Sequence, residues 1–323
     1  MKIIKKRKII YAAGLHSGGG LFILNYLREI ISSKEDIFFL DERLKKDKFY
    51  NKFNIFIVKN NFFSKLYNEL KIKLIYDKNN NEIIYLNGLP PIFKLKTKVV
   101  SYFQNANIIP IKFYDFFDIN FIFSKNFLRF IKFILFKKNC YKWYVFSKFS
   151  NKILSKYVPS NKIYLKKINI NARKRKMLNK YDFIYPASGE NHKNHRRLFE
   201  ALIILSKKKI FPKLVVTLNK YELNKFNIKY IKKKYSLKIY NKYSNNRIKF
   251  LNMYNQCKAL IYPSLSETLG LPLLEAKKFN IDIITSNKEF AKEYNNPKLI
   301  FNPYSSISIA NKIERYILKK TTN

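Results

Sequence analysis

The chain has 323 residues, of which 47% are hydrophobic and 17% aromatic, and its formal net charge is +44. This length exceeds what one hydrophobic core usually supports, so we expect two domains, and the apolar content excludes a disordered chain. The positive charge is mostly lysine spread from end to end, whereas a nucleic-acid surface needs clustered arginine and aromatic residues. An anionic membrane surface is the partner that such a charge would favour.

Cysteine content and hydropathy point to the compartment. Cys140 and Cys257 are far apart, with neither a pairing pattern nor metal-ligand spacing, which indicates a reducing cytosolic setting. The basic residues 1–8 run into a short strand instead of an apolar stretch of signal-peptide length, and no segment approaches the roughly 20 apolar residues that cross a bilayer. We expect a cytoplasmic protein, or one that is peripheral on the inner face of the cell membrane.

The first half of the chain alternates apolar strand patterns with helical ones. Strands are predicted at 9–12, 37–40, 83–86, 99–103 and 143–146, and helices at 21–27, 62–70 and 147–157. Residues 14–20 form a glycine-rich loop between the first strand and the first helix. The spacing of these glycines differs from Gly-x-Gly-x-x-Gly, so an NAD site is not predicted.

Residues 120–138 are both aromatic and basic, and Lys125, Arg129 and Lys132 fall on one face of the expected helix. We favour a buried helix of the first domain. The alternative is a helix that lies on a membrane carrying a lipid-linked acceptor.

A basic segment at 159–180, which includes Arg173 to Lys176, interrupts the pattern and predicts an interdomain linker. A second alternating series follows it. Strands are predicted at 183–185, 214–217, 248–251, 259–262 and 281–286, and helices at 195–208, 221–234 and 307–318. Strand and helix alternate in both halves, so the fold class is α/β with parallel sheets.

Two carboxylates, Glu267 and Glu275, flank a glycine turn and a predicted helix start. Pro272 stands where a helix can begin without losing a needed amide donor. Free amides at a helix start bind anions, whereas carboxylates accept hydrogen bonds from hydroxyl groups. A nucleotide sugar offers both a phosphate and many hydroxyls.

The string Ser-Glu267-Thr-Leu-Gly270-Leu-Pro272-Leu-Leu-Glu275-Ala and the strand that follows resemble the Glu-x7-Glu signature of glycosyltransferase family 4, or group 1. Members of this family are retaining glycosyltransferases of the GT-B fold, with two Rossmann-like domains that face each other across a cleft. The resemblance implies an N-terminal acceptor-side domain at 1–165 and a nucleotide-sugar-binding domain at 166–305. It also implies a terminal helix at 306–323 that crosses back to the first domain.

The same resemblance implies roles for individual residues. Lys193 and Glu267 would be catalytic, on the diphosphate and on the sugar hydroxyls. The predicted donor-binding residues are Glu275 on the ribose, Gly18, Gly19, Ser188, Thr268, Leu269 and Gly270. The predicted acceptor-side residues are His16, Gln104 and Asn105. An exposed lysine at Lys193 and a helix-capping carboxylate at Glu275 are the alternative interpretations.

The sequence departs from the family pattern near Ser188, where many members carry an arginine shortly before the lysine. Arg196, Arg197 or a residue of the other domain are candidates to replace that cation. The chain has no Asp-x-Asp motif, so we expect a metal-independent reaction with the nucleotide sugar as co-substrate and no cofactor. His192 and His195 lack partners for a zinc site.

The resemblance therefore predicts a retaining glycosyltransferase that acts on a glycan or lipid-linked acceptor in bacterial surface polysaccharide or lipopolysaccharide synthesis. Two alternatives stay open at this point. One is a basic nucleic-acid-binding protein, and the other is a non-catalytic subunit with a glycosyltransferase-like fold.

Overall fold

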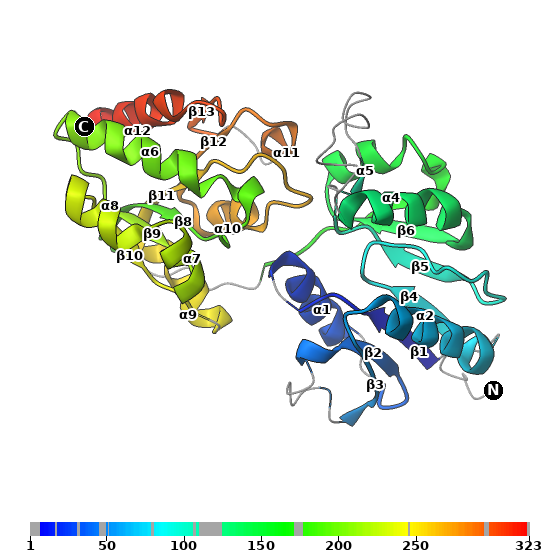
Figure 1. Ribbon diagram of the computed structural model, residues 1–323. Coiled ribbons are helices and arrows are strands. Elements are labelled where there is room, and N and C mark those ends of the chain that lie inside the picture. The colour runs from blue at the N-terminus through cyan, green and yellow to red at the C-terminus, as the bar shows by residue number, and fades with distance from the viewer. Residues whose placement is uncertain are drawn as a thin grey trace. The chain divides into compact units, whose positions relative to one another are not determined.

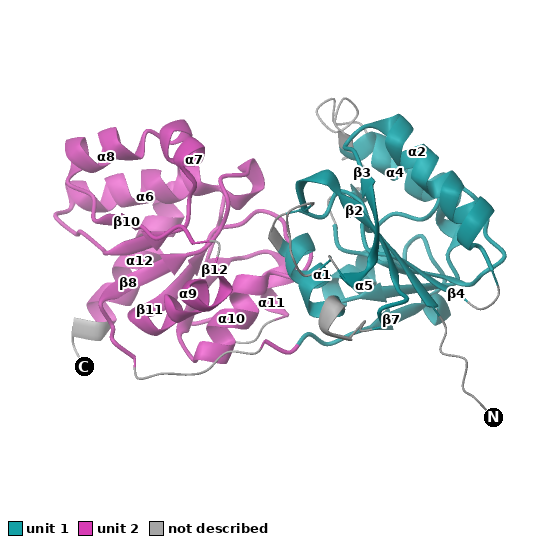
Figure 2. Cartoon of the chain, turned by 90° about the horizontal axis from the view of Figure 1, so that it is seen from below, with its two compact units in different colours: residues 1–168 teal, residues 169–323 magenta. Residues whose placement is uncertain are grey.

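The chain divides into two compact units, residues 1–168 and residues 169–323 (Figure 2). The computed structural model describes residues 7–321 except 17, 31–32, 45–49, 51, 79–80, 106–107, 110–124, 171–176, 245 and 294–296. The division lies close to the predicted boundary at 165/166. Arg173 to Lys176 of the expected linker and residues 120–124 of the basic aromatic stretch fall outside the described residues.

Unit 1 contains a sheet of seven parallel strands in the order β3-β2-β1-β4-β5-β6-β7 (Figure 1). Its strands are β1 Arg7–Ala12, β2 Ile37–Asp41, β3 Asn54–Val58, β4 Asn81–Tyr85, β5 Val99–Tyr102, β6 Lys142–Val145 and β7 Ile163–Leu165. Continuous apolar runs such as Ile9 to Ala12 are buried because helices cover both faces of a parallel sheet.

The main helices of unit 1 are α1 Gly18–Ile30, α2 Phe62–Lys71, α4 Lys125–Phe136 and α5 Lys148–Leu154, and the π-helix η3 Ile72–Tyr76 continues α2. The chain moves one way across the sheet through α1 and the other way through α2 and α4. Right-handed crossovers therefore place α1 on one face and α2 with α4 on the other, as Figure 2 shows.

Unit 2 contains a sheet of six parallel strands in the order β10-β9-β8-β11-β12-β13. Its strands are β8 Tyr181–Tyr185, β9 Leu214–Val216, β10 Ile239–Asn241, β11 Cys257–Tyr262, β12 Asp282–Ser286 and β13 Leu299–Phe301. Its helices are α6 His195–Lys207, α7 Lys220–Lys225, α8 Ile228–Tyr235, α9 Arg247–Asn252, α10 Leu271–Phe279, α11 Glu289–Lys292 and α12 Ser306–Thr321.

The terminal helix α12 belongs to unit 2 and lies beside α6 (Figure 1). Its apolar stripe is fully buried within the unit, and the ring of Tyr316 packs 5.5 Å from that of Phe183 on β8. Its buried face completes the core of unit 2. The return of this helix to the first domain stays a prediction.

Two predicted elements of unit 2 differ from the structure. The strand expected at 248–251 is wrong, because these residues lie in helix α9, whose start is capped by the side chain of Asn246 on the amide of Lys249. A run of four residues fits either a strand or a helix turn, and the hydrogen bond from the capping residue stabilises the helix. The helix expected at 221–234 is divided into α7 and α8 at Asn227, whose φ is 50°.

No helix among the described residues combines the length and the apolar character that a membrane span requires.

Candidate functional site

The predicted catalytic residues Lys193 and Glu267 form an ion pair in unit 2. Lys193 ends the short 3-10 helix η8 Asn191–Lys193 that follows β8, and Glu267 lies in the loop between β11 and α10. The Lys193 Nζ atom is 2.7 Å from Glu267 Oε1, and the two side chains are 16% and 10% exposed. Since β8 and β11 are neighbours, the carboxyl ends of two parallel strands bring the pair together.

Main-chain and hydroxyl groups hold these two loops against each other. The Tyr185 hydroxyl donates to the carbonyl of Lys193 at 2.5 Å and lies 3.1 Å from Ser264 Oγ. The amide of Leu265 donates to the carbonyl of His192 at 2.8 Å. The separation of the lysine from the glutamate is therefore set by the backbone as well as by their own charges.

Asn194 ties a third loop to the same place. Its backbone is left-handed, with φ 63°, which asparagine tolerates better than most residues. Its buried side-chain amide donates to the carbonyls of Pro263 at 3.1 Å and Pro303 at 2.7 Å. One residue thus connects the loops that follow β8, β11 and β13.

Glu275, the predicted ribose ligand, is 1% exposed on α10 and has both carboxylate oxygens engaged. Oε1 accepts from the guanidinium of Arg247 on α9, and Oε2 accepts from the hydroxyl of Tyr254 at 2.5 Å. Burial raises the pKa of this carboxyl, although Arg247 and Tyr254 act in the opposite direction. The Arg247 side chain is 41% exposed, so it has room to leave Glu275.

The turn between the two glutamates has the form that the sequence indicates. Gly270 has φ 64° and caps the start of α10, and Pro272 stands in the first turn of that helix. Thr268 and Leu269, the other predicted donor contacts, are half-buried in the loop beside Glu267. The left-handed glycine lets the chain enter α10 directly after the loop.

The loop at Ser188, where the family arginine is missing, holds a cation from another element. Lys225 on α7 donates to the carbonyl of Gly189 at 2.9 Å and to Asn191 Oδ1 at 3.2 Å. The amide of Gly189 donates to Glu222 at 2.6 Å, and Ser188 Oγ donates to Glu190 at 3.3 Å.

The two arginines that we considered as replacements bind elsewhere. Arg196 pairs with Glu200 on the exposed face of α6. Arg197 donates to the carbonyl of Tyr304 at 3.1 Å and to Asn194 Oδ1 at 3.4 Å.

His195, directly after Asn194, is buried and stacks on Phe226 at 5.3 Å between ring centroids. Its two ring nitrogens have no hydrogen-bond partner among the residues that the structure describes. Burial, together with the positive charges of Lys193 and Lys225, lowers its pKa to about 3. A neutral ring at this place packs the core beneath the lysine, and it cannot carry a proton at neutral pH.

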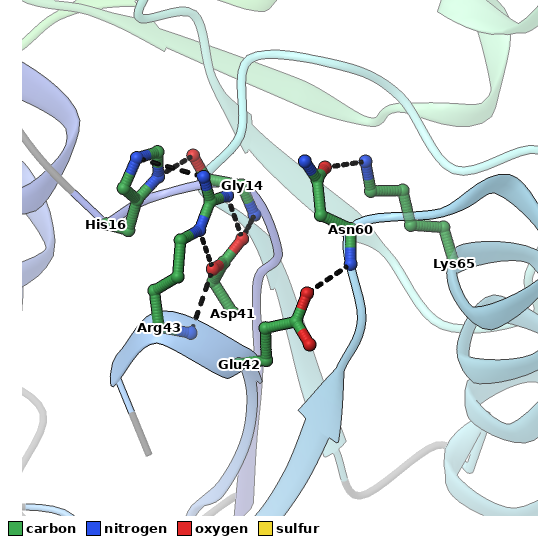
Figure 3. A network of polar contacts seen from close by, with 7 residues as sticks. All are labelled: Gly14, His16, Asp41, Glu42, Arg43, Asn60 and Lys65. Carbon is green, nitrogen blue, oxygen red and sulfur yellow. Dashed lines mark hydrogen bonds and ion pairs between the residues drawn. The ribbon is translucent and has the colours of Figure 1, made fainter. Parts of the chain in front are cut away.

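In unit 1 the predicted acceptor-side residue His16 belongs to a polar network at the carboxyl ends of β1 and β2 (Figure 3). Arg43 Nη1 lies 3.0 Å from His16 Nε2, and Gly14 O lies 3.3 Å from His16 Nδ1. A guanidinium only donates and a carbonyl only accepts, so this arrangement suits the tautomer in which Nε2 accepts and Nδ1 donates.

Buried Asp41 holds this network in place. It accepts from the amide of Gly14 at 3.0 Å and from Arg43 Nε at 2.6 Å and Nη2 at 2.7 Å. Burial pushes the pKa of Asp41 upward, but the hydrogen bonds and charge of Arg43 outweigh it, so that the pKa is lowered.

Three other predicted residues of unit 1, Gly18, Gly19 and Gln104, lie at or beside the start of α1. Gly18 and Gly19 are the first residues of this helix, whereas we expected them in the preceding loop. A Cβ atom added at the next residue, Gly20, would lie 2.8 Å from a side-chain carbon of Leu15 and 3.6 Å from Gln104 Oε1. Gln104 therefore lies beside the helix start, and its neighbour Asn105 is half-buried in the segment that follows β5.

Among the residues that the structure describes, no group of three or more His, Cys, Asp or Glu side chains is arranged to hold a metal ion.

The sequence did not reveal five residues that shape these sites. They are Asp41, Arg43, Lys225, Arg247 and Tyr254. Asp41 follows a buried strand, which is a detectable signal. Arg247 was hidden because its segment was assigned to a strand, and Lys225 is one of many lysines with nothing in the sequence to mark it.

Comparison with known proteins identifies the class of the second unit. The family model described as "Glycosyl transferases group 1" matches residues 166–323. No protein of curated function matches the sequence. Unit 2 is therefore a group 1 glycosyltransferase domain, and the prediction of a glycosyltransferase is confirmed.

Solved structures match nearly the whole chain. HepE from Anabaena in complex with UDP and glucose has a TM-score of 0.69 at 13% identity, over 97% of this chain and 90% of that one. A glycosyltransferase from Rickettsia africae has a TM-score of 0.64 at 18% identity, over 96% and 88%.

The apo form of the lipopolysaccharide outer core galactosyltransferase WaaB has a TM-score of 0.62 at 14% identity, over 97% of this chain and 90% of that one. The predicted fold class, GT-B with two parallel α/β units, is confirmed by these matches.

Proposed function

We propose that the protein transfers a sugar from a nucleotide-sugar donor to a hydroxyl of a glycan or lipid-linked acceptor, with retention of configuration and without a metal. The observation that carries this proposal is the 2.7 Å ion pair between Lys193 and Glu267 inside a group 1 domain. A half-buried ammonium beside a half-buried carboxylate suits a ligand that presents a phosphate next to sugar hydroxyls. HepE, which has the same fold, is known in complexes with UDP and with UDP-glucose.

In the proposed reaction the bond between the anomeric carbon and the diphosphate oxygen breaks, and a bond to the acceptor oxygen forms. The acceptor hydroxyl gives its proton to the leaving phosphate. Lys193 balances the negative charge that develops on the diphosphate, and Glu267 accepts hydrogen bonds from the sugar hydroxyls. Both interactions strengthen as charge separates, which is what lowers the barrier.

Glu275 binds the ribose hydroxyls in this proposal, and that requires Arg247 to release it. Lys225, tied to the loop at Gly189, takes the place of the family arginine on the phosphate side. In our proposal Ser188, Thr268, Leu269 and Gly270 of unit 2 also bind the donor. Gly18 and Gly19 of unit 1 keep their proposed role in donor binding, and His16, Gln104 and Asn105 of the same unit keep theirs in acceptor binding.

The acceptor belongs in our proposal to bacterial surface polysaccharide or lipopolysaccharide synthesis, and the enzyme works at the inner face of the cell membrane. The fold shared with WaaB, a lipopolysaccharide outer core galactosyltransferase, supports this assignment.

The test compares two lysine variants of unit 2. Lys193→Ala should abolish most hydrolysis and transfer of a nucleotide sugar chosen by thermal shift from a panel. Lys258→Ala is the matched control, because Lys258 also forms an ion pair, with Asp182 at 2.8 Å, but lies near the amino end of β11.

Equal activity of Lys193→Ala and Lys258→Ala would refute the assignment of Lys193 to the catalytic site. A wild-type protein that binds nucleotides yet turns over none of the panel would favour the non-catalytic alternative.

A further inference from the structure

Helix α2 of unit 1 is amphipathic in the opposite sense to an ordinary surface helix. Asn68 and Glu69 are buried, whereas Phe63, Tyr67 and Leu70 are exposed at the i, i+4, i+7 spacing of one helical face. Glu69 is satisfied inside by the amide of Ile92 and by Lys132 of α4, each at 2.6 Å. The apolar stripe is therefore left on the outside.

The neighbouring helix α4 adds a second stripe on the same side of the sheet (Figure 2). Its Phe130 and Phe133 are buried in unit 1, while Leu128, Ile131 and Leu135 are exposed at the i, i+3, i+7 spacing. The buried face agrees with the expected buried helix of the first domain, and the exposed face leaves the membrane alternative as a prediction. Exposed apolar side chains on two neighbouring helices are typical of an interaction surface.

The charges on α2, η3 and α4 define what this surface can bind. Glu69 is the one acidic residue in the two segments 62–76 and 125–136, and it is buried. Lys73 and Arg129 are exposed. Burial and the charges of Arg129, Arg43 and Lys132 lower the pKa of Lys65 on α2. Cations without an exposed acid among them favour an anionic partner.

We infer that the exposed stripes of α2 and α4 dock unit 1 onto an anionic lipid surface. Apolar side chains flanked by lysine and arginine match the boundary between acyl chains and charged headgroups. A second copy of this chain fits less well, because docking the same face on itself would bring like charges together in a protein of net charge +44. The sugar chemistry proposed above is not needed for this inference.

The experiment measures partition of the full-length protein onto vesicles of phosphatidylglycerol mixed with phosphatidylcholine, against phosphatidylcholine alone, with no nucleotide sugar present. We expect binding to the mixed vesicles alone, weakening as salt is added. The apolar test variant combines Phe63→Ser, Leu128→Ser and Leu135→Ser, whose side chains are 80%, 69% and 66% exposed. It should bind about 100-fold more weakly.

A matched control changes equally exposed apolar residues of unit 2. It combines Tyr221→Ser, Ile248→Ser and Ile307→Ser, which are 77%, 70% and 62% exposed, and it should bind as the wild type does. A charge variant, Lys73→Gln with Arg129→Gln, should bind roughly 30-fold more weakly. Its control is Lys229→Gln with Lys233→Gln on α8.

Three outcomes would overturn the inference. They are equal partition onto both kinds of vesicle, equal losses in the test and control sets, and a wild-type dimer in solution that the apolar variant dissociates. The last outcome would assign the face to a second copy. The vesicle experiment contains no sugar donor, so a failure to bind vesicles would not affect the proposal of sugar transfer. In the same way, normal activity of Lys193→Ala would not affect the proposal of membrane docking.

Discussion

Replacing Arg247 by glutamine should destabilise unit 2 in a pH-dependent way. The change removes the cation from Glu275, whose side chain is 1% exposed. Among the described residues, the hydrogen bond from Tyr254 then remains. Removing one partner of a fully buried pair costs about 3–5 kcal/mol. Arg247 is 41% exposed and solvent screens it, so we expect a loss of about 2 kcal/mol at pH 8. That corresponds to a fall of roughly 4 to 8 °C in Tm.

The sign of the pH dependence follows from the raised pKa of Glu275. The folded state holds this proton more tightly than the unfolded state, in which a glutamate titrates near pH ~4.3. Stability is therefore lost as the pH rises above that value, and removal of Arg247 raises the pKa further and enlarges the loss. In thermal denaturation, Arg247→Gln should lower Tm less at pH 4 than at pH 8.

The control for this measurement is Arg196→Gln, which breaks the exposed pair with Glu200. Exposed pairs contribute about 0–1 kcal/mol, so this variant should stay close to the wild type at both pH values. Equal losses in the two variants, or a loss from Arg247→Gln that does not change with pH, would refute the reasoning.

Two further variants test buried groups. The pKa of His195 is lowered to about 3, so the wild type should lose stability as the pH falls below ~6.5, by up to about 1.4 kcal/mol per pH unit. His195→Phe should flatten this dependence in urea unfolding, and identical curves for the two proteins would count against a buried neutral ring. Asp41→Asn places an amide donor against Arg43 and the amide of Gly14, and should cost about 2 kcal/mol in urea unfolding. The exposed control Glu42→Gln should change stability little, and an equal loss there would contradict the role given to Asp41.

Local sequence patterns predicted much of the architecture and part of the site. The apolar runs at 9–12, 37–40 and 259–262 became central strands because each is continuous and long enough to be buried on both faces. The glycine and proline between Glu267 and Glu275 indicate the turn and the helix start, so the sequence alone places one carboxylate in the loop and the other on the helix.

The contacts of those residues were not predictable in the same way. The charged partner of Glu275 lies 28 residues earlier, on a helix whose residues 248–251, three apolar and one lysine, also fit a strand. The outward stripe of α2 was missed because a helical spacing identifies a face and does not say which face is buried. That choice depends on Glu69 reaching Lys132, 63 residues away.

The two carbonyls held by Asn194 have a consequence for how unit 2 selects its ligand. The Asn194 side chain holds together the loops that follow three strands, β8, β11 and β13. Loops restrained in this way have little freedom to change conformation for different ligands. We expect discrimination among sugars to depend on which side chains project from the clamped loops. Exchanging those side chains, with Asn194 left in place, is the direct route to changing what this unit accepts.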